Sequence, residues 1–372
     1  MFHPLPEFVR TGLAFVVVLG VLVFVHELGH YLAARWRGVR VDVFSIGFGR
    51  ALVRWTDRVG TEWRIAWIPL GGFVKLHGQE RPEDAPPEVR ASWIPGETFH
   101  GKSVASRAIV VAAGPIANFL LAMVLFAALF ATAGRQVTLP IAGGVVPDSA
   151  ASRAGLQVGD RIEAIAGLPV HTFEDLQQII SARPDESLML TVRRGDATID
   201  LPVTTGEQTT VGGRRVGMLG VRSSNRTEYQ KMSLPAALWG GVAQTWRVLS
   251  ETATGVAQMI VGQRGADELG GPLRIAQLSG QVAELGVASL VSFMAVLSVN
   301  LGLINLFPIP ILDGGHLLFF LAEAIRGRPI PQRAQEYGFR AGLALIGALF
   351  IFATWNDLSN LGIVHWVARL AG

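Results

Sequence analysis

The sequence predicts a mainly α-helical membrane protein, on two observations. Half of the 372 residues are hydrophobic, only 16% are charged, and the mean hydropathy is +0.39. Four apolar stretches are long enough to cross a bilayer, which takes about 20 helical residues. They cover residues 11–34, 105–133, 288–325 (with an interruption) and 339–356. The rest of the chain is too polar for a protein made only of spans, so we also expect a water-facing part.

Arginines predict how these spans are oriented. The first stretch is too long for a signal peptide and has little positive charge before it, and arginines follow it at 35, 37 and 40. More arginines crowd the loop between the last two stretches, at 326, 328, 333 and 340. Because Lys and Arg favour the cytoplasmic side, we expect both termini and residues 134–286 outside the cytoplasm, which in a bacterium is the periplasm.

Composition excludes two other kinds of site. The net charge is only +3, and the basic residues cluster beside apolar runs, which indicates membrane topology and no nucleic-acid partner. The chain has no cysteine, so disulfides and cysteine metal ligands are excluded.

Between the first two spans, residues 41–80 read as short β-strands around a turn near 57–60. We expect a hairpin associated with the inner face of the membrane, whose exposed edge holds an extended substrate. Gly47, Gly49, Gly71 and Gly72 would allow close backbone approach there. A structural hairpin anchored to the bilayer is the alternative.

Between the second and third spans, residues 140–205 read as a small α/β unit with one helix, capped by Thr172 or a neighbour. Residues 233–263 have an amphipathic pattern with Trp239 and Trp246, typical of a helix at the membrane interface. We therefore divide the chain into a membrane core at 1–134, a globular domain at 135–210, an interfacial helical region at 211–286 and a second membrane core at 287–372.

The first span contains His26-Glu27-Leu28-Gly29-His30. Residues four apart share a helix face, so both imidazoles can bind one metal ion, and Glu27 can take a proton from a water on that ion. Zinc lowers the pKa of bound water from about 15.7 to about 7. A chance pentapeptide with satisfied polar groups is the alternative. Ionisable residues inside a span are costly and usually functional, which favours the metal site.

A catalytic zinc site takes three protein ligands, and the third candidate lies in the interrupted stretch. Pro308 and Pro310 break the helix there, and a carboxylate follows at Asp313. Together with Asn300 and Asn305, this pattern suggests a buried polar cavity. The alternative is an interfacial turn in which the acid stands at the start of a helix. Spacing alone leaves Asp313 and His316 open as the third ligand, with Asp313 preferred.

Three motifs in this order resemble the site-2 protease family of intramembrane zinc metalloproteases, in its bacterial regulator-of-sigma-E-protease group. They are HELGH in the first span, AAGPIAN at 112–118 and NLFPIPILDGG at 305–315. The likeness extends to FSIGFGRAL, IPLGGFVK and GPLRIAQLSGQVAELG. The resemblance implies that His26, His30 and Asp313 bind Zn²⁺, and so selects Asp313 over His316. It further implies that Glu27 is the catalytic acid and base and that Asn305 contacts substrate. Asn300 and Asn118 match motif positions with a supporting role, and we count Asn300 among the candidate substrate-binding residues.

The resemblance also implies the fold and the partners. It identifies the α/β unit as one PDZ domain outside the cytoplasm, on the pattern VPDSAASRAGLQVGDRIEAIAGLPV. Better-known relatives carry two tandem PDZ domains, whereas this chain has room for one. A mechanism in which two PDZ domains control substrate access is therefore in doubt here. The implied function is regulated intramembrane proteolysis in the inner membrane. A site-1 protease first trims a single-span substrate such as an anti-sigma factor, and signal-peptide remnants are a second substrate class.

Two other functions compete with a protease: a PDZ membrane scaffold without catalysis, and a metal transporter. Glu27 favours the protease, because a scaffold has no use for it and a transporter would carry polar residues along several spans. The other histidines show no ligand spacing, and we expect them at surfaces or interfaces; they are His3, His77, His100, His171 and His365.

Overall fold

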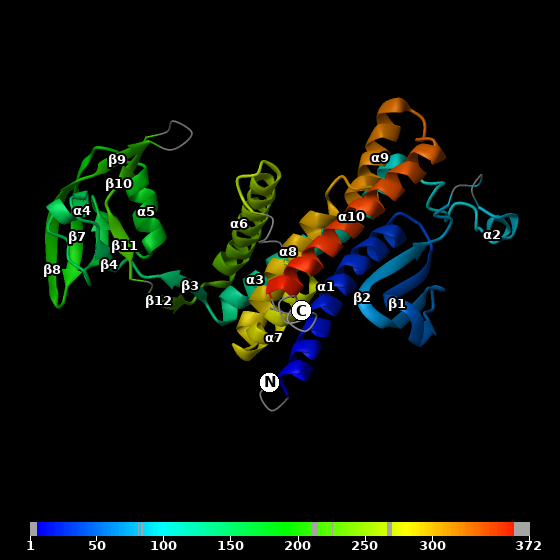
Figure 1. The fold of residues 1–372 in the computed structure, drawn as a ribbon, viewed down its shortest axis with the longest axis horizontal. Coiled ribbons are helices and arrows are strands. Elements are labelled where there is room, and N and C mark those ends of the chain that lie inside the picture. Colours follow the sequence, from blue (N-terminus) through cyan, green and yellow to red (C-terminus); the bar gives the residue numbers. More distant parts are fainter. Residues whose placement is uncertain are drawn as a thin grey trace, which may run out of the picture. The chain divides into compact units, whose positions relative to one another are not determined.

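The structure is a computed structural model that describes residues 6–80, 82, 85–209, 215–224, 226–265 and 270–360. The chain forms two compact units. One contains Met1–Leu129 and Leu234–Gly372, and the other Phe130–Ser233. Figure 1 shows the elements of each unit, which we describe separately.

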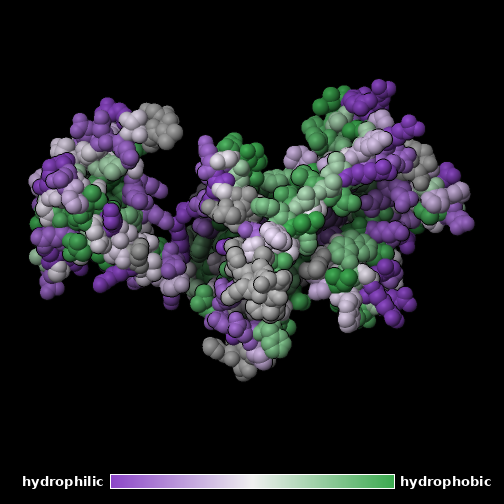
Figure 2. Space-filling view, viewed as in Figure 1, coloured by the Kyte–Doolittle hydropathy of each residue, from purple (hydrophilic) through white to green (hydrophobic). Residues whose placement is uncertain are grey.

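Within the described residues, four helices are long and apolar enough to cross a membrane, and they match the four predicted stretches. They are α1 (Glu7–Trp36), α3 (Val104–Thr132), α8 (Val287–Asn305) and α10 (Gln332–Asn360). In Figure 2 hydrophobic side chains run along α10, while hydrophilic ones gather where α9 and α10 meet. The predicted interruption is present: α8 ends at Asn305, and α9 (Asp313–Arg326) begins after the two prolines.

Two further helices of this unit are α6 (Leu234–Ile260) and α7 (Pro272–Glu284). Helix α7 lies against α1, α8 and α10. Arg10 of α1 forms an ion pair with Glu284 of α7. The buried Asp357 of α10 accepts hydrogen bonds from the backbone N–H groups of Gly271 and Arg274, at 2.9 and 3.0 Å. These N–H groups at the start of α7 have no intrahelical partner, so Asp357 caps the helix from another segment.

The segment between α1 and α3 is an antiparallel strand pair, β1 (Val41–Thr56) and β2 (Glu62–Leu76), followed by the short helix α2 (Pro87–Ala91). Several register shifts interrupt the pairing, and bulges of this kind bend and twist a strand. The pair lies beside α1 (Figure 1), where Phe44 stacks on Trp63 at 4.4 Å between ring centroids, with Tyr31 of α1 edge-on to both. Aromatic packing therefore fixes the strands to the helix that carries the two histidines.

The second unit is mostly antiparallel sheet. Its largest sheet has the order β6-β5-β7-β8, and three two-stranded pairs join β10 to β9, β11 to β4 and β12 to β3. Its elements are β3 (Arg135–Thr138), β4 (Ala142–Val145), α4 (Ala150–Arg153), β5 (Arg161–Ile165), β6 (Leu168–Pro169), α5 (Phe173–Ser181), β7 (Ser187–Arg194), β8 (Ala197–Thr204), β9 (Gly206–Thr209), β10 (Arg215–Met218), β11 (Val221–Ser223) and β12 (Thr227–Gln230). Ile162, Ile165 and Leu190 are fully buried in its core.

Two expectations for this unit can be compared with the structure. Thr172 caps α5 as expected: its side chain accepts from the N–H of Asp175, whose carboxylate accepts in return from the N–H of Thr172. The expected boundary at 210 is too early. Residues 215–230 contain three strands, and two of these pair with β4 and β3 at the beginning of the unit. These strands are too short to show a periodic hydrophobic pattern. The sequence therefore did not reveal that the chain returns to pair with β4 and β3.

Candidate metal centre

The two histidines of α1 point to one place. His26 and His30 are separated by one helical turn, their Nε2 atoms are 3.2 Å apart, and their rings meet edge to face. Their side chains are only 11% and 12% exposed. Two buried imidazole nitrogens face each other at this distance without repulsion only if a proton or a metal ion lies between them or beside them.

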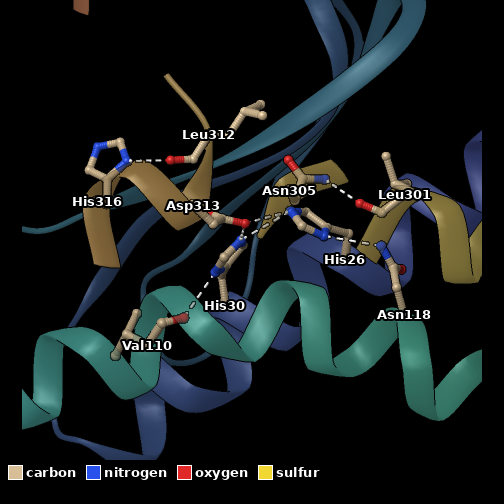
Figure 3. A network of polar contacts seen from close by, with 9 residues as sticks. All are labelled: His26, His30, Val110, Asn118, Leu301, Asn305, Leu312, Asp313 and His316. Atoms are coloured by element: carbon tan, nitrogen blue, oxygen red, sulfur yellow. Dashed lines mark hydrogen bonds and ion pairs between the residues drawn. The ribbon is translucent and has the colours of Figure 1, made fainter. Parts of the chain in front are cut away.

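Asp313 completes the cluster from α9. Its Oδ2 lies 3.2 Å from Nε2 of His26 and 3.4 Å from Nε2 of His30. Figure 3 shows the three side chains converging from α1 and the first residue of α9. The tight turn before α9 requires Gly314 and Gly315, because a Cβ at either position would lie 2.2–2.3 Å from backbone atoms of Leu306 and Ile309. The break in the third stretch thus brings a carboxylate to the histidines.

The cluster fits a zinc ion on donor chemistry and spacing. Among the described residues it is the one group of three or more potential ligands close enough to share a metal. Ligand atoms held about 2.0–2.2 Å from a tetrahedral zinc are about 3.3 Å apart, and the three separations here are 3.2, 3.2 and 3.4 Å. Oδ2 of Asp313 is also buried with no hydrogen-bond partner among the described residues. A cation would satisfy that oxygen.

His316, the alternative third ligand, lies outside the cluster. Its Nδ1 is 3.1 Å from the carbonyl oxygen of Leu312, and in Figure 3 its ring points away from Asp313. It lines a cavity of about 450 Å³ together with Arg107 and Glu323. Asp313 and His316 are three residues apart in the first turn of α9, but their side chains point in different directions.

Helix α3 supplies contacts that the sequence reasoning missed. Nδ1 of His30 donates to the carbonyl oxygen of Val110 at 2.9 Å, and Nδ1 of His26 lies 3.2 Å from the side-chain amide of Asn118. Gly114 lies between them, and a Cβ there would be 2.3 Å from Nε2 of His30. Residues 110, 114 and 118 recur every four positions on one helix face, and that spacing is the signal that would have pointed to this role for AAGPIAN.

Glu27 is buried beside the cluster, 8% exposed, on the residue after His26. The backbone N–H of Val74 in β2 hydrogen-bonds to its carboxylate. Gly72 of the same strand packs against it so closely that a Cβ would lie 3.1 Å from Cγ of Glu27. The strand pair therefore contacts the carboxylate directly, which the sequence did not reveal.

The predicted substrate residues lie in two kinds of place. Asn305 is near the cluster in Figure 3, and its Nδ2 donates to the carbonyl oxygen of Leu301 at 3.0 Å. Asn300 instead accepts from the hydroxyl of Thr252 on α6 at 3.0 Å, a contact between helices. Its predicted contact with substrate stays a prediction without support from these neighbours.

Three of the four hairpin glycines have backbone conformations that account for them. Gly47, Gly49 and Gly71 adopt positive φ of 89°, 87° and 115°, where other residues are strained. A Cβ at Gly47 would lie 2.7 Å from the carbonyl oxygen of Ile68, and one at Gly71 would lie 2.6 Å from the Phe48 ring. In the structure, the group that approaches each of these two backbones closely belongs to the hairpin itself. Substrate contact at these positions stays a prediction.

Comparison with known proteins identifies relatives that are named as metalloproteases, which is consistent with a metal site at this cluster. Residues 14–349 match Peptidase family M50. A Rhizobium meliloti protein named as a zinc metalloprotease is 44% identical over 93% of this chain and 96% of its own length. Metalloprotease MmpA of Caulobacter vibrioides is 36% identical over 95% and 96%, respectively. Regulator of sigma-E protease RseP of Escherichia coli is 33% identical over 94% and 98%.

The RseP alignment spans 448 positions, more than the length of this chain, so RseP contains residues that this chain lacks. Among solved structures, the PDZ domain of an SdrC-like protein from Listeria monocytogenes covers 24% of this chain and 87% of that domain, at 17% identity and a TM-score of 0.19. The family match covers most of the chain, including both histidines and Asp313. The chain belongs to Peptidase family M50.

Proposed function

We propose that this protein is an intramembrane zinc metalloprotease that hydrolyses peptide bonds within or beside transmembrane segments of other membrane proteins. The convergence of His26, His30 and Asp313 carries the proposal, because it supplies three buried donors at zinc spacing on apolar helices. Membership of a peptidase family and relatives named as zinc metalloproteases support it.

The three residues would hold the ion through Nε2, Nε2 and Oδ2. Bound there, zinc would supply Lewis acidity, which polarises a peptide carbonyl and lowers the pKa of water from about 15.7 to about 7. Glu27 accepts the proton of the attacking water and delivers it to the amine of the departing chain. Its hydrogen bond with the Val74 N–H keeps the carboxylate at this place on α1.

The β1–β2 pair is proposed to hold the substrate. A helical segment hides its peptide bonds in its own hydrogen bonds and must be extended before cleavage, and a strand edge offers main-chain partners for the extended form. Direct contact of β2 with Glu27 supports this, because a chain aligned along the pair would pass beside the carboxylate. Asn305 is a candidate to bind the substrate backbone near the cluster.

The cellular setting is also proposed. The arginines beside the spans favour the bacterial inner membrane, with residues 134–286 and both termini in the periplasm. The antiparallel sheet and two short helices of this unit, together with the sequence pattern at 146–170, support a PDZ domain. The proposed substrates are single-span proteins of the anti-sigma-factor type that a site-1 protease has already trimmed, and signal-peptide remnants.

The test is cleavage of a co-expressed single-span reporter by wild type, Glu27→Gln and Glu7→Gln. Glu7 is exposed on the same helix and serves as the matched control. We expect Glu27→Gln to abolish cleavage, because general base catalysis alone contributes about 10²–10⁴-fold, and Glu7→Gln to cleave like wild type. Equal cleavage by wild type and Glu27→Gln would reject the protease mechanism. Unchanged zinc content in His26→Ala would reject the ligand assignment separately.

A further inference from the structure

Asn118 of α3 is a fully buried polar residue beside the metal cluster, at 0% exposure. Its backbone carbonyl accepts from the hydroxyl of Ser298 on α8 at 2.7 Å. Its side-chain amide reaches Nδ1 of His26 at 3.2 Å, as Figure 3 shows. Burying a side-chain amide in an apolar span costs free energy unless its polar atoms are hydrogen-bonded, and polar residues inside spans are usually functional.

His30 shows what the cluster requires of an imidazole. Its Nδ1 faces the carbonyl oxygen of Val110 at 2.9 Å, and a carbonyl can only accept. In the neutral ring Nδ1 of His30 therefore carries the proton, and the lone pair of Nε2 is directed to the point where Asp313 and His26 converge, which is where a metal ion would bind. That is the tautomer that can bind a metal through Nε2.

His26 needs the same tautomer for the same reason. Its Nδ1 must then donate. In the structure the Asn118 atom 3.2 Å from this nitrogen is Nδ2, which can only donate, so the amide has to turn to bring its acceptor Oδ1 there. The oxygen and the NH₂ of an amide are nearly equal in size. Oδ1 of Asn118 is buried with no hydrogen-bond partner among the described residues, so a half-turn of the amide that brings Oδ1 to His26 breaks no bond of that oxygen.

We propose that Asn118 is a positioning residue that accepts the Nδ1 proton of His26 through its amide oxygen and so keeps Nε2 of His26 free to bind zinc. The proposal rests on the proposed zinc centre. It gives the two histidines matching partners on α3, a backbone carbonyl for His30 and a side-chain oxygen for His26, two helical turns apart. Outer partners of this kind are worth about 10–100-fold in metal affinity.

The experiment measures the zinc dissociation constant of the full-length protein in detergent by competition with a chromophoric chelator. Asn118→Leu removes the acceptor at similar volume, and Asn118→Ala removes it without any added bulk. Asn118→Asp keeps an acceptor oxygen at the same position. Ser298→Ala is the matched control, because it removes a contact of the Asn118 backbone and leaves the side chain intact.

We expect zinc affinity to fall about 10–100-fold in Asn118→Leu and Asn118→Ala, and to stay within a few-fold of wild type in Asn118→Asp and Ser298→Ala. The zinc-loaded protein gives a second readout: with ¹⁵N-labelled histidine, wild type should show a proton on Nδ1 of His26 that exchanges slowly with water, and Asn118→Leu should lose this protection. A role in packing alone would predict the reverse order, with the leucine variant tolerated and the buried aspartate damaging.

Wild-type affinity in both Asn118→Leu and Asn118→Ala would overturn the inference, as would loss of affinity in Asn118→Asp equal to that in Asn118→Ala. Failure of the proposed function looks different, because wild type itself would then bind no zinc. If wild type binds zinc and all variants bind it equally, only the role of Asn118 is rejected.

Discussion

Asp313 in the membrane unit and Asp160 in the second unit are both shielded carboxylates, yet their surroundings differ. Asp160 is 1% exposed and accepts from Arg194 at 2.7 and 2.8 Å and from the N–H of Gln157 at 2.9 Å. Asp313 has two imidazole nitrogens near Oδ2 and no hydrogen bond to that oxygen among the described residues. Asp160 belongs to a network of satisfied hydrogen bonds, whereas Oδ2 of Asp313 is placed to bind a cation together with the two imidazoles.

The histidines give the same contrast within one unit. His77 is buried, at 6% exposure, where we predicted a surface or interface position. Its Nδ1 contacts Asp42 at 2.9 Å and its Nε2 accepts from the N–H of Ile94 at 2.9 Å, so both nitrogens are satisfied. His26 and His30 direct Nε2 atoms at each other and at a carboxylate. Nitrogen atoms that converge on one point, more than burial itself, therefore distinguish the candidate metal ligands from a structural histidine. His3 and His365 lie outside the described residues.

The largest expected difference between the two carboxylates comes from making the same substitution at Asp313 and at Asp160. Asp313→Asn should lower zinc affinity by more than about 100-fold, since it replaces a ligand and not merely an outer partner. Asp160→Asn should leave zinc affinity unchanged. Metal analysis of the purified full-length variants checks both. Retained zinc in Asp313→Asn would show that this carboxylate, like Asp160, has only a structural part.

Packing against the histidines can be tested at a glycine. A Cβ at Gly114 would lie 2.3 Å from Nε2 and 2.5 Å from Cε1 of His30, and 2.9 Å from Cε1 of His26. Gly114→Ala should therefore displace both rings and reduce zinc affinity by about 10-fold or more. Gly20→Ala in α1, where a Cβ meets nothing within 4 Å, is the control. Equal zinc affinity in the two variants would contradict the close fit of α3 to the cluster.

The structural acid should show itself in the stability of the second unit. Hydrogen bonds from Arg194 lower the pKa of Asp160 below its ordinary value. A lowered folded-state pKa stabilises above the unfolded-state pKa of about 3.9, and that stability is lost as the pH falls through the folded value. Asp160→Asn should cost about 1–3 kcal/mol at neutral pH. Limited proteolysis of residues 130–233 in the full-length protein should show the variant's deficit shrinking below pH 4; a constant deficit would contradict the charge argument.

The smallest expected effect concerns the cap of α5. Thr172→Ala removes the side-chain acceptor for the Asp175 N–H and should destabilise this unit by about 1 kcal/mol. The same proteolysis assay measures it, and Thr172→Ser, which keeps the hydroxyl, should lose much less. Zinc affinity should not respond, because the cap and the metal cluster belong to different units. Similar losses in the alanine and serine variants would assign the effect to packing of the methyl group.

The sequence by itself determined the elements whose signal is local. Apolar length gave the spans that became α1, α3, α8 and α10, since a bilayer sets the length of a helix that crosses it. His26 and His30 were paired by helical periodicity alone, and the prolines at 308 and 310 marked the break between α8 and α9. Thr172 was identified as a cap from its place before an amphipathic run.

Only the tertiary structure decided which distant groups meet. Spacing left Asp313 and His316 open, because three residues on one helix do not determine which side chain faces another helix. The contacts of Val110 and Asn118 with the histidines, and of Val74 with Glu27, join segments far apart in sequence. The return of β11 and β12 to the start of the second unit was equally hidden, since strand pairing leaves no trace in either strand alone. Local pattern fixes helices and caps, whereas a site assembled across helices depends on packing.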